Sequence, residues 1–244
     1  MRLDTFLTEN KIYESRTRSA RAIKENCVKV NGKTITKASF EVNEDDKIEW
    51  KADPVPYVSR GAFKLEFGLD KANIDVEGLK AVDIGASTGG FTEVLLMRNI
   101  ESVAAVDIGH DQLNDKIKNN PKVASFEGTD IRDFIVDEGK YDIAVTDVSF
   151  ISIKIIAPHI FRLLKNGGRA VILIKPQFEV GKKFLNKKGV VKDIKLAHKT
   201  AKEIANFFES IGLKVAGLWE SPIKGGDGNT EFVCVCRREN EIDV

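Results

Sequence analysis

The stretch "AVDIGASTGGFTEVLL", residues 81–96, decides the fold of this chain. It begins as an apolar, β-rich run that ends in an acid, continues as a glycine-rich turn, and ends in a helical pattern. Gly85, Gly89 and Gly90 let the backbone pass close to a ligand, just before the N-terminus of the helix. The next strand, "SVAAVD", ends in Asp107, where a carboxylate can accept both hydroxyls of a ribose. This combination predicts an α/β fold with a site for a nucleotide-like cofactor.

Strands and helices continue to alternate over residues 59–240, which predicts one large α/β domain. Its β-rich runs are continuously apolar, as expected for a mostly parallel sheet that helices cover on both faces. The last two runs, residues 213–221 and 231–238, flank a turn around "KGGDGN". We therefore expect an antiparallel hairpin at the C-terminal edge of the sheet.

The first 52 residues predict a small α+β domain of their own. Two short helical patterns come first, and Ser15 is the expected N-cap of the second. A strand, an Asn-Gly turn and a second strand follow within "VKVNGKTITKASFEV", residues 28–42. Two prolines within residues 53–58 mark a linker between the two domains.

The net charge of +1 hides an uneven distribution. Between Lys11 and Lys37 there are eight basic and two acidic residues. Between Ala38 and Asp53 there are two basic and six acidic residues. The basic stripe near the N-terminus favours a polyanionic partner over a neutral metabolite.

Composition argues against several classes of protein. No apolar run approaches the roughly 18–20 residues needed to span a bilayer, and the N-terminus lacks the apolar stretch of a secretory signal. Cys27, Cys234 and Cys236 show no metal-ligand spacing. We therefore expect a cytoplasmic protein, monomeric, with neither a membrane nor a metal partner.

Three charged residues stand where predicted strands end or begin. Asp147 follows the fourth strand in "VTDVSF", Lys175 follows the fifth in "ILIKPQFE", and Glu231 begins the last in "GNTEF". In open α/β sheets the carboxyl ends of the strands form the ligand-binding edge. Burying the charge of a lysine at the end of a buried strand costs free energy unless the amine has a partner or a function. The alternative is that the side chain extends to the surface and its amine stays in solvent.

Residues 81–96, Asp83 before the turn, Asp130 after the third strand and the terminal hairpin together resemble the class I S-adenosylmethionine-dependent methyltransferases. An NAD-binding fold and a non-catalytic relic share the glycine-rich turn and are the alternatives. The resemblance implies that Asp83 orders the cationic amino-acid part of S-adenosylmethionine, while Asp107 holds the ribose and Asp130 the adenine amino group. The implied cofactor-binding residues are Asp83, Gly85, Ala86, Ser87, Gly89, Gly90, Phe91, Asp107, Ile108, Asp130, Ile131 and Asp147.

A set of four residues, Lys64, Asp147, Lys175 and Glu231, resembles the K-D-K-E tetrad of the FtsJ-like (RrmJ-type) ribose 2′-O-methyltransferases. The stretch "SRGAFKL", residues 59–65, matches the entry helix of that family, with its serine as the expected cap. The resemblance implies that Lys175 orients or deprotonates a ribose 2′-hydroxyl, with Asp147 fixing its direction. Glu231 would pair with Lys64. The pattern does not distinguish a general base from an aligning group.

The N-terminal domain resembles the S-four RNA-binding domain, an αL-type fold, through "RLDTFL", "SRTRSARAIKE" and "VKVNGK". The whole chain resembles the TlyA/hemolysin A family, through "PYVSRGAFKL", "TDVSFIS" and "SPIKGGDGNTEF" among other stretches. This resemblance implies 2′-O-methylation of ribose, at cytidine, in ribosomal RNA within ribosomal subunits, with a mobile basic loop at residues 180–193 over the substrate. The implied RNA contacts are Arg16, Arg18, Arg21, Lys24, Lys29, Lys33, Arg60, Lys182, Lys183, Lys187 and Lys188.

Two other functions stay open at this point. The family name suggests a hemolysin, but the sequence offers no spanning segment and no strongly amphipathic lytic helix. An RNA-binding adaptor with an inactive methyltransferase domain is the second alternative, and the intact tetrad argues against it. The sequence does not indicate which nucleotide or which ribosomal subunit would be modified.

Overall fold

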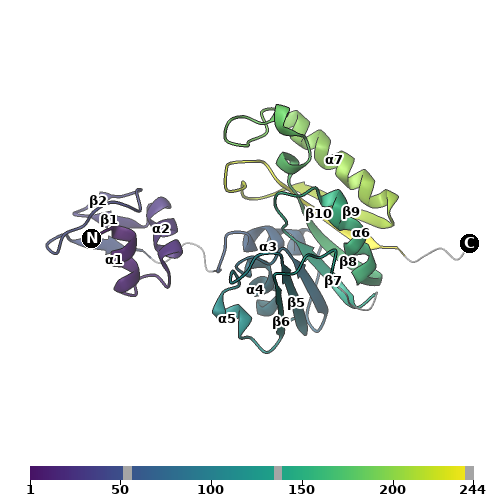
Figure 1. Ribbon diagram of the computed structural model, residues 1–244, viewed down its shortest axis with the longest axis horizontal. Helices are drawn as coiled ribbons and strands as arrows, with labels where there is room; N and C mark the ends of the chain where they lie inside the picture. The colour runs from purple at the N-terminus through teal and green to yellow at the C-terminus, as the bar shows by residue number, and fades with distance from the viewer. Residues whose placement is uncertain (52–56, 135–138, 240–244) are drawn as a thin grey trace, which may run out of the picture. The chain divides into compact units, whose positions relative to one another are not determined.

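The computed structural model describes residues 1–51, 57–134 and 139–239, and the chain falls into two compact units, residues 1–56 and 57–244 (Figure 1). Most of the expected linker, residues 53–56, lies outside the described residues. Tyr57 and Val58, which the sequence placed in that linker, are anchored in the second unit. Tyr57 is buried, and the Val58 amide donates a hydrogen bond to Glu93 at 2.6 Å.

The first unit packs two helices against a three-stranded antiparallel sheet of order β2-β1-β3. Ser15 caps the second helix as expected, because its hydroxyl accepts a hydrogen bond from the Arg18 amide. Asn31 and Gly32 have φ values of 50° and 77°, which suit an Asn-Gly hairpin turn. The elements are α1 (Leu3–Glu9), α2 (Arg16–Lys24), β1 (Val28–Val30), β2 (Lys33–Thr34) and β3 (Ile48–Trp50).

The second unit is built on a seven-stranded sheet of order β6-β5-β4-β7-β8-β10-β9. All neighbouring strands pair in parallel except β10, which runs antiparallel to both β8 and β9. The predicted parallel sheet with a C-terminal antiparallel hairpin is therefore confirmed. The strands are β4 (Lys80–Ile84), β5 (Ser102–Asp107), β6 (Val123–Glu127), β7 (Tyr141–Thr146), β8 (Leu164–Ile174), β9 (Leu213–Glu220) and β10 (Phe232–Arg238).

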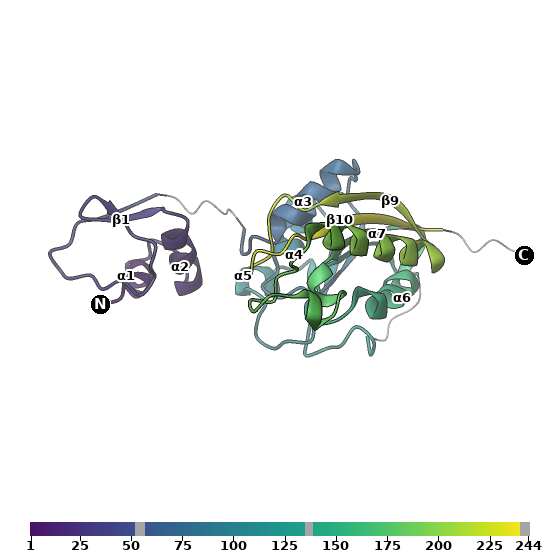
Figure 2. The ribbon, with the colours of Figure 1, turned by 90° about the horizontal axis from the view of Figure 1, so that it is seen from above.

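Helices cover both faces of this sheet, as its continuously apolar strands require. Figure 2 shows α3 (Ala62–Lys71) on one side of β9 and β10, with α6 (Ile153–Leu163) and α7 (Ile194–Ser210) on the other. The helix α4 (Gly90–Met97) packs beside α3. The remaining short elements are α5 (Asp115–Lys118) and the 3-10 turns η1 (Pro176–Phe178) and η2 (Lys182–Phe184).

The entry helix α3 begins later than the sequence predicted. Ser59 is not its cap: the helix starts at Ala62, and Gly61 occupies the cap position without a side-chain hydrogen bond. The Ser59 hydroxyl instead packs against Gly90, where an added Cβ would overlap its oxygen. Ser59 therefore packs the segment before α3 against the first residue of α4. This is a tertiary contact, which local capping rules do not predict.

The glycine-rich turn between β4 and α4 needs glycine for two reasons. Gly85 and Gly89 have φ values of 81° and 93°, in the left-handed region that side chains disfavour. A Cβ on Gly85 would lie 3.1 Å from the carbonyl oxygen of Asp147, the residue that follows β7. The absence of a side chain thus lets the ends of β4 and β7 approach closely at the carboxyl edge of the sheet.

Candidate active site

A pocket of about 490 Å³ lies at the carboxyl edge of the parallel strands. One wall is the glycine-rich turn, and another is the turn at the start of α3. A third is the loop between β9 and β10. Its lining residues are Ser59, Arg60, Gly61, Lys64, Gly85, Ala86, Ser87, Thr88, Gly90, Phe91, Asp147, Ser149, Lys175, Ile223, Lys224 and Gly226.

The four predicted catalytic side chains meet in and beside this pocket. The Nζ of Lys64 donates to Glu231 Oε2 at 2.6 Å and lies 4.0 Å from Asp147 Oδ2. The Nζ of Lys175 lies 2.6 Å from Asp147 Oδ1. Asp147 therefore faces both lysines, one with each oxygen, and the expected pairing of Glu231 with Lys64 is confirmed.

Burial makes these charges unusual. The side chains of Lys64 and Lys175 are only 9% and 10% exposed, and that of Glu231 only 4%. A buried charge is costly unless it is paired, and here two ammonium groups face two carboxylates. The arrangement balances the charge while it holds the Lys175 amine against the pocket.

Two hydrogen-bonding partners of these groups were missed at the sequence level. The Lys175 Nζ donates to Ser149 Oγ at 2.7 Å, and the Gln177 amide donates to Glu231 Oε1 at 3.0 Å. Ser149 lies two residues after Asp147 and Gln177 two residues after Lys175, so their places close to predicted catalytic residues were the available signal. Each fixes the direction of a charged side chain.

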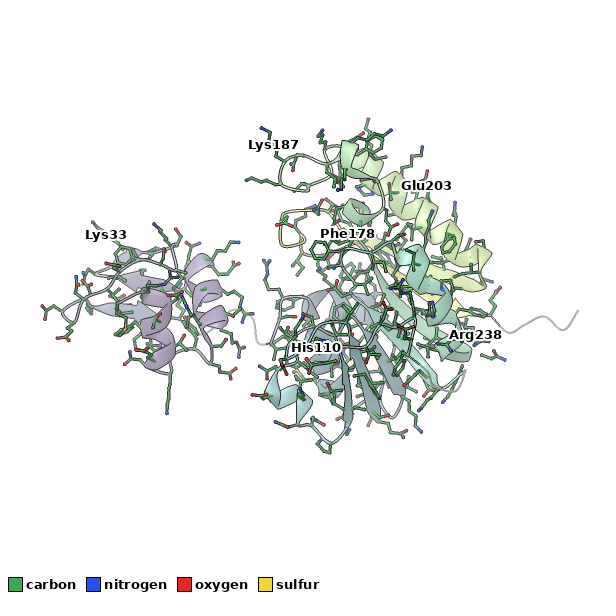
Figure 3. All side chains as sticks on the ribbon, viewed as in Figure 1. Lys33, His110, Phe178, Lys187, Glu203 and Arg238 are labelled. Atoms are coloured by element: carbon green, nitrogen blue, oxygen red, sulfur yellow. The ribbon has the colours of Figure 1, made fainter. Side chains whose placement is uncertain are left out.

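A pair of aromatic rings lies next to the predicted catalytic groups, with the Lys175 Nζ 5.9 Å from the ring centroid of Phe178. Phe150 is 91% exposed and has a φ of 64°, and its ring centroid is 5.2 Å from that of Phe178. Figure 3 labels Phe178, which follows the end of β8. Glu179 accepts hydrogen bonds from the Ser152 hydroxyl at 2.6 Å and the Ile153 amide at 2.8 Å, which fixes the loop that carries Phe150. An exposed phenylalanine beside a polar pocket was not foreseen.

The predicted cofactor residues divide into two groups. Those that line the pocket are Gly85, Ala86, Ser87, Gly90, Phe91 and Asp147. Those outside its lining are Asp83, Gly89, Asp107, Ile108, Asp130 and Ile131. The Asp107 carboxylate accepts hydrogen bonds from the amides of Ser87 and Gly109 at 2.8 and 2.7 Å. The Asp130 carboxylate is engaged by the Arg132 side chain, and this hydrogen bond lowers the pKa of Asp130 to about 2.

Asp83 tests whether this region suits a cofactor with a cationic group. Its carboxylate is fully buried, and one oxygen accepts a hydrogen bond from the Thr92 hydroxyl at 2.7 Å. The other oxygen has no partner among the described residues. Burial, with a smaller contribution from the nearby Asp147, raises the pKa of Asp83 to about 7. A buried carboxylate with a free oxygen beside a glycine-rich cradle fits such a cofactor.

The predicted RNA contacts of the first unit differ in their exposure and in whether they pair with acids. Arg16 donates to the buried carboxylate of Asp4 at 3.0 Å, and Arg18 pairs with Glu14. Arg21 is half-buried. The remaining cations of that unit's predicted set, Lys24, Lys29 and Lys33, are exposed.

The basic loop of the second unit was expected to be mobile, but a bridge and hydrogen bonds hold it in place. Leu185 and Val191 form an antiparallel bridge across it. The buried side chain of Asn229 accepts from the Val191 amide at 3.0 Å and donates to the Gly189 carbonyl at 3.1 Å. This ties the loop to the segment that carries Glu231. The predicted contacts Lys182, Lys183, Lys187 and Lys188 are all exposed, and Figure 3 shows Lys187 on this loop. Arg60 is exposed at the pocket.

Within residues 1–51, 57–134 and 139–239, none of the helices has the length and apolar character that crossing a membrane requires. The same ranges hold no group of three or more histidine, cysteine or acidic side chains arranged to bind a metal ion.

A seven-stranded sheet of this topology, with a glycine-rich pocket at its carboxyl edge, defines the class I S-adenosylmethionine-dependent methyltransferases. The chain belongs to the FtsJ-like methyltransferase family, which residues 57–238 match, and residues 1–48 match the S4 domain. The predicted family is therefore confirmed, as are both predicted folds.

Full-length relatives carry two kinds of name. The chain is 34% identical to the 16S/23S rRNA (cytidine-2′-O)-methyltransferase TlyA of Mycobacterium tuberculosis, over 98% of this chain and 91% of that protein. It is 39% identical to Hemolysin A of Brachyspira hyodysenteriae, over 96% of this chain and 98% of that protein. A solved structure of a protein named as a hemolysin, from Streptococcus thermophilus, matches with a TM-score of 0.77 and 34% identity, covering 98% of this chain and 89% of that one.

Proposed function

We propose that this protein methylates the 2′-hydroxyl of a ribose in ribosomal RNA, with cytidine as the target nucleotide and S-adenosylmethionine as the methyl donor. The observation that carries the proposal is the pair of buried lysine–carboxylate contacts at the glycine-lined pocket. The relative named as an rRNA (cytidine-2′-O)-methyltransferase supports the choice of substrate. A ribosomal substrate places the activity in the cytoplasm.

The pocket and its surroundings would hold the cofactor. Gly85, Ser87 and Phe91 line the pocket, Asp83 supplies a buried carboxylate for a cationic group, and Asp107 stands at the end of β5 for the ribose hydroxyls. When bound, S-adenosylmethionine supplies a methyl group on a sulfonium centre, which is already a strong electrophile. The protein therefore contributes mainly alignment and proton handling.

Lys175 is the group we assign to the 2′-hydroxyl. Its amine is held between Asp147 Oδ1 and Ser149 Oγ, both in the same part of the pocket. An amine fixed in this way can align the attacking oxygen and accept or steer its proton. Lys64, fixed by Glu231, adds a second positive charge close to Asp147.

The RNA would be held at several places. Phe150 presents an exposed ring beside the catalytic groups, on which the base of the target nucleotide can stack. The exposed lysines of the S4 domain and of the loop around Lys187 would bind phosphates. Arg60, at the edge of the pocket, would lie near the backbone of the target strand.

The two alternatives have less support. A membrane-lytic function gives no reason for burying two lysine–carboxylate pairs beside a glycine-rich pocket. An inactive RNA-binding adaptor would not need the Lys175 amine to be fixed by two partners. The catalytic arrangement favours an active methyltransferase over both.

The test is to find where the methyl group is attached. Unmodified ribosomal subunits are incubated with the protein and S-adenosylmethionine carrying a labelled methyl group, and the RNA is digested to nucleosides. We expect the label in 2′-O-methylcytidine. Label in a base, or no transfer to either subunit together with lysis of red cells by the purified protein, would contradict the proposal.

A further inference from the structure

We propose that the outer face of α7 is a second RNA-binding surface, which holds the phosphate backbone of a helical RNA arm next to the target nucleotide. Its contact residues are Lys195, Lys199 and Lys202, none of which belongs to the predicted RNA-binding set. The surface continues the basic loop that precedes the helix. This inference rests on the proposed function, because it takes RNA as the substrate.

Charge is concentrated in this part of the chain. Residues 182–202 contain eight lysines and a single acid, Asp193. The three α7 lysines are exposed, whereas Ala201, Ile204 and Phe208 of the same helix are buried in the core of the unit. The helix therefore has one apolar face and one basic face.

These lysines are mostly without counter-charges in the protein. Among the described residues, Lys199 alone of the eight has a carboxylate within ion-pair distance, that of Glu203 at 3.7 Å. Both partners are largely exposed, so this contact is weak. Unneutralised positive charge held on a rigid helix attracts a polyanion.

The order of charges along α7 argues against a role in stabilising the helix. Acidic side chains favour the N-terminus of a helix and basic ones its C-terminus. In α7 the first turn holds Lys195 and no acid, and the last turn holds no basic residue. The Lys199–Glu203 pair also has the less favourable order for a spacing of four residues. Of the three lysines, Lys195 is thus placed where its positive charge opposes the helix dipole.

The spacing suits a nucleic-acid backbone. Lys195 and Lys202 are seven residues apart, which is about 10 Å along a helix axis. Along one strand of a DNA duplex, phosphates follow each other at about 3.4 Å of axial rise, and the rise in an A-form RNA helix is shorter, so the three lysines span about three phosphates or more. Sequence-independent contacts of this kind position an RNA without reading its bases.

The surface is fixed relative to the active site. The basic loop joins η1, which follows Lys175, to α7, and Asn229 fastens this loop to the segment that carries Glu231. Figure 3 shows Lys187 on the loop and Glu203 on α7 in the same part of the unit. An RNA arm bound along α7 would therefore be held at a defined position relative to the catalytic groups.

The test compares two triple variants of the full-length protein. The first is Lys195→Gln with Lys199→Gln and Lys202→Gln. The control removes the same charge from exposed lysines away from the catalytic edge, through Lys71→Gln, Lys140→Gln and Lys214→Gln. Binding of transcribed, unmodified ribosomal RNA is measured from 50 to 300 mM salt.

We expect the α7 variant to bind RNA about tenfold more weakly at 100 mM salt, with the slope of log affinity against log salt reduced by about two to three. The KM for ribosomal subunits should rise by a similar factor, and the control should match the wild type. Because Lys195 opposes the helix dipole and the Lys199–Glu203 contact is weak, the urea midpoint of the α7 variant should not fall. Equal RNA binding by both triple variants would overturn the proposal.

A gain-of-binding variant covers the case in which the triple variant folds poorly. Glu203→Gln removes the acid next to Lys199 and should raise RNA affinity about twofold; no increase would count against the surface.

Vesicles containing phosphatidylserine are tested in parallel, and a loss of vesicle binding with RNA binding retained would assign α7 to a membrane instead. Methyl transfer by the wild type is measured in the same preparation. If the wild type transfers no methyl group, the proposed function fails. If it transfers the methyl group but the α7 variant binds RNA as well as the wild type, only this inference fails.

Discussion

The neighbouring strands β7 and β8 carry a lysine–aspartate pair at each end, and the two pairs differ in their surroundings. At the amino ends, Lys165 lies 2.6 Å from Asp142, and the lysine side chain is 45% exposed. At the carboxyl ends, Lys175 lies 2.6 Å from Asp147, and the lysine side chain is 10% exposed. The residue types and the distance are the same. Burial and the pocket distinguish the two.

This difference shows how to interpret a charged pair. An exposed pair contributes about 0–1 kcal/mol to stability and has no further consequence. In a buried pair, the cost of removing both charges from water can exceed their mutual attraction. Such a pair is therefore often no more stabilising than an apolar replacement. The pair at the carboxyl ends is therefore weak evidence for stability, and its position beside the pocket makes it evidence for catalysis.

The largest effect is expected from removing the charge of the aspartate that faces the two buried lysines. Asp147→Asn keeps the shape of the side chain but leaves the amines of Lys64 and Lys175 without their shared counter-charge. We expect methyl transfer to fall by about 10²–10⁴-fold, as for other groups that position a proton-transfer residue. The measurement is the single-turnover rate on ribosomal subunits. Asp142→Asn is the matched control, and equal losses in the two variants would show that burial at the carboxyl ends has no catalytic meaning.

A second comparison uses a glycine at each end of the sheet. Gly85 and Gly139 both have positive φ, 81° and 64°, so alanine strains the backbone at either position. Only at Gly85 would the added Cβ also approach the Asp147 carbonyl, at 3.1 Å. We expect Gly85→Ala to weaken binding of S-adenosylmethionine by about 10- to 100-fold, from about 1–3 kcal/mol of strain. Calorimetry measures this affinity directly. A comparable loss of affinity in Gly139→Ala would show that the position of Gly85 beside Asp147 does not matter for cofactor binding.

A third prediction concerns pH and the buried Asp83. Its pKa is raised from 3.8 to about 7, so between these values the folded protein binds a proton that the unfolded chain has lost. The free energy of unfolding should therefore fall with rising pH, by up to about 1.4 kcal/mol per unit between pH 5 and 6. Asp83→Asn should abolish this slope, whereas Asp142→Asn should retain it because the pKa of Asp142 is lowered. Urea titrations from pH 5 to 8 measure it, and a flat wild-type profile would contradict the burial argument.

The smallest effect is expected in the S4 unit, where the predicted RNA contacts are exposed. Lys24, Lys29 and Lys33 are free to bind phosphates, whereas Arg16 and Arg18 already pair with acids. Replacing the three lysines with glutamine should weaken RNA binding severalfold and flatten its salt dependence. Neutralising Arg16, Arg18 and Arg21 together should do the same to a lesser extent. Unchanged RNA affinity in both variants would assign this unit another role.

The sequence predicted the sheet, and the meeting of Asp147 and Lys175 at its edge, because both depend on simple rules. Continuously apolar strands alternate with helices, and Asp147 and Lys175 follow directly after buried strands. The carboxyl ends of parallel strands meet at one edge, which brings these residues together. The contact between Lys64 and Glu231, 167 residues apart, followed from the family resemblance rather than from any local pattern.

Tertiary hydrogen bonds were beyond such rules. Ser59 was expected to cap α3, but its hydroxyl packs against Gly90 of another element. Ser149 and Gln177 orient catalytic side chains only because loops from distant parts of the chain fold over the pocket. Phe150 is exposed and has a positive φ, and the preference of phenylalanine for buried positions and ordinary backbone regions predicts neither.

The central claim is that Lys175 acts on the ribose hydroxyl, and its counterpart at the other end of β8 provides the most direct test. Lys175→Ala and Lys165→Ala are compared for transfer of labelled methyl groups to unmodified ribosomal subunits, together with their affinity for S-adenosylmethionine. We predict that Lys175→Ala loses about 10²–10⁴-fold in rate with cofactor binding retained, whereas Lys165→Ala stays within about twofold of the wild type. Transfer by Lys175→Ala at the wild-type rate, or equal losses in both variants, would contradict the account.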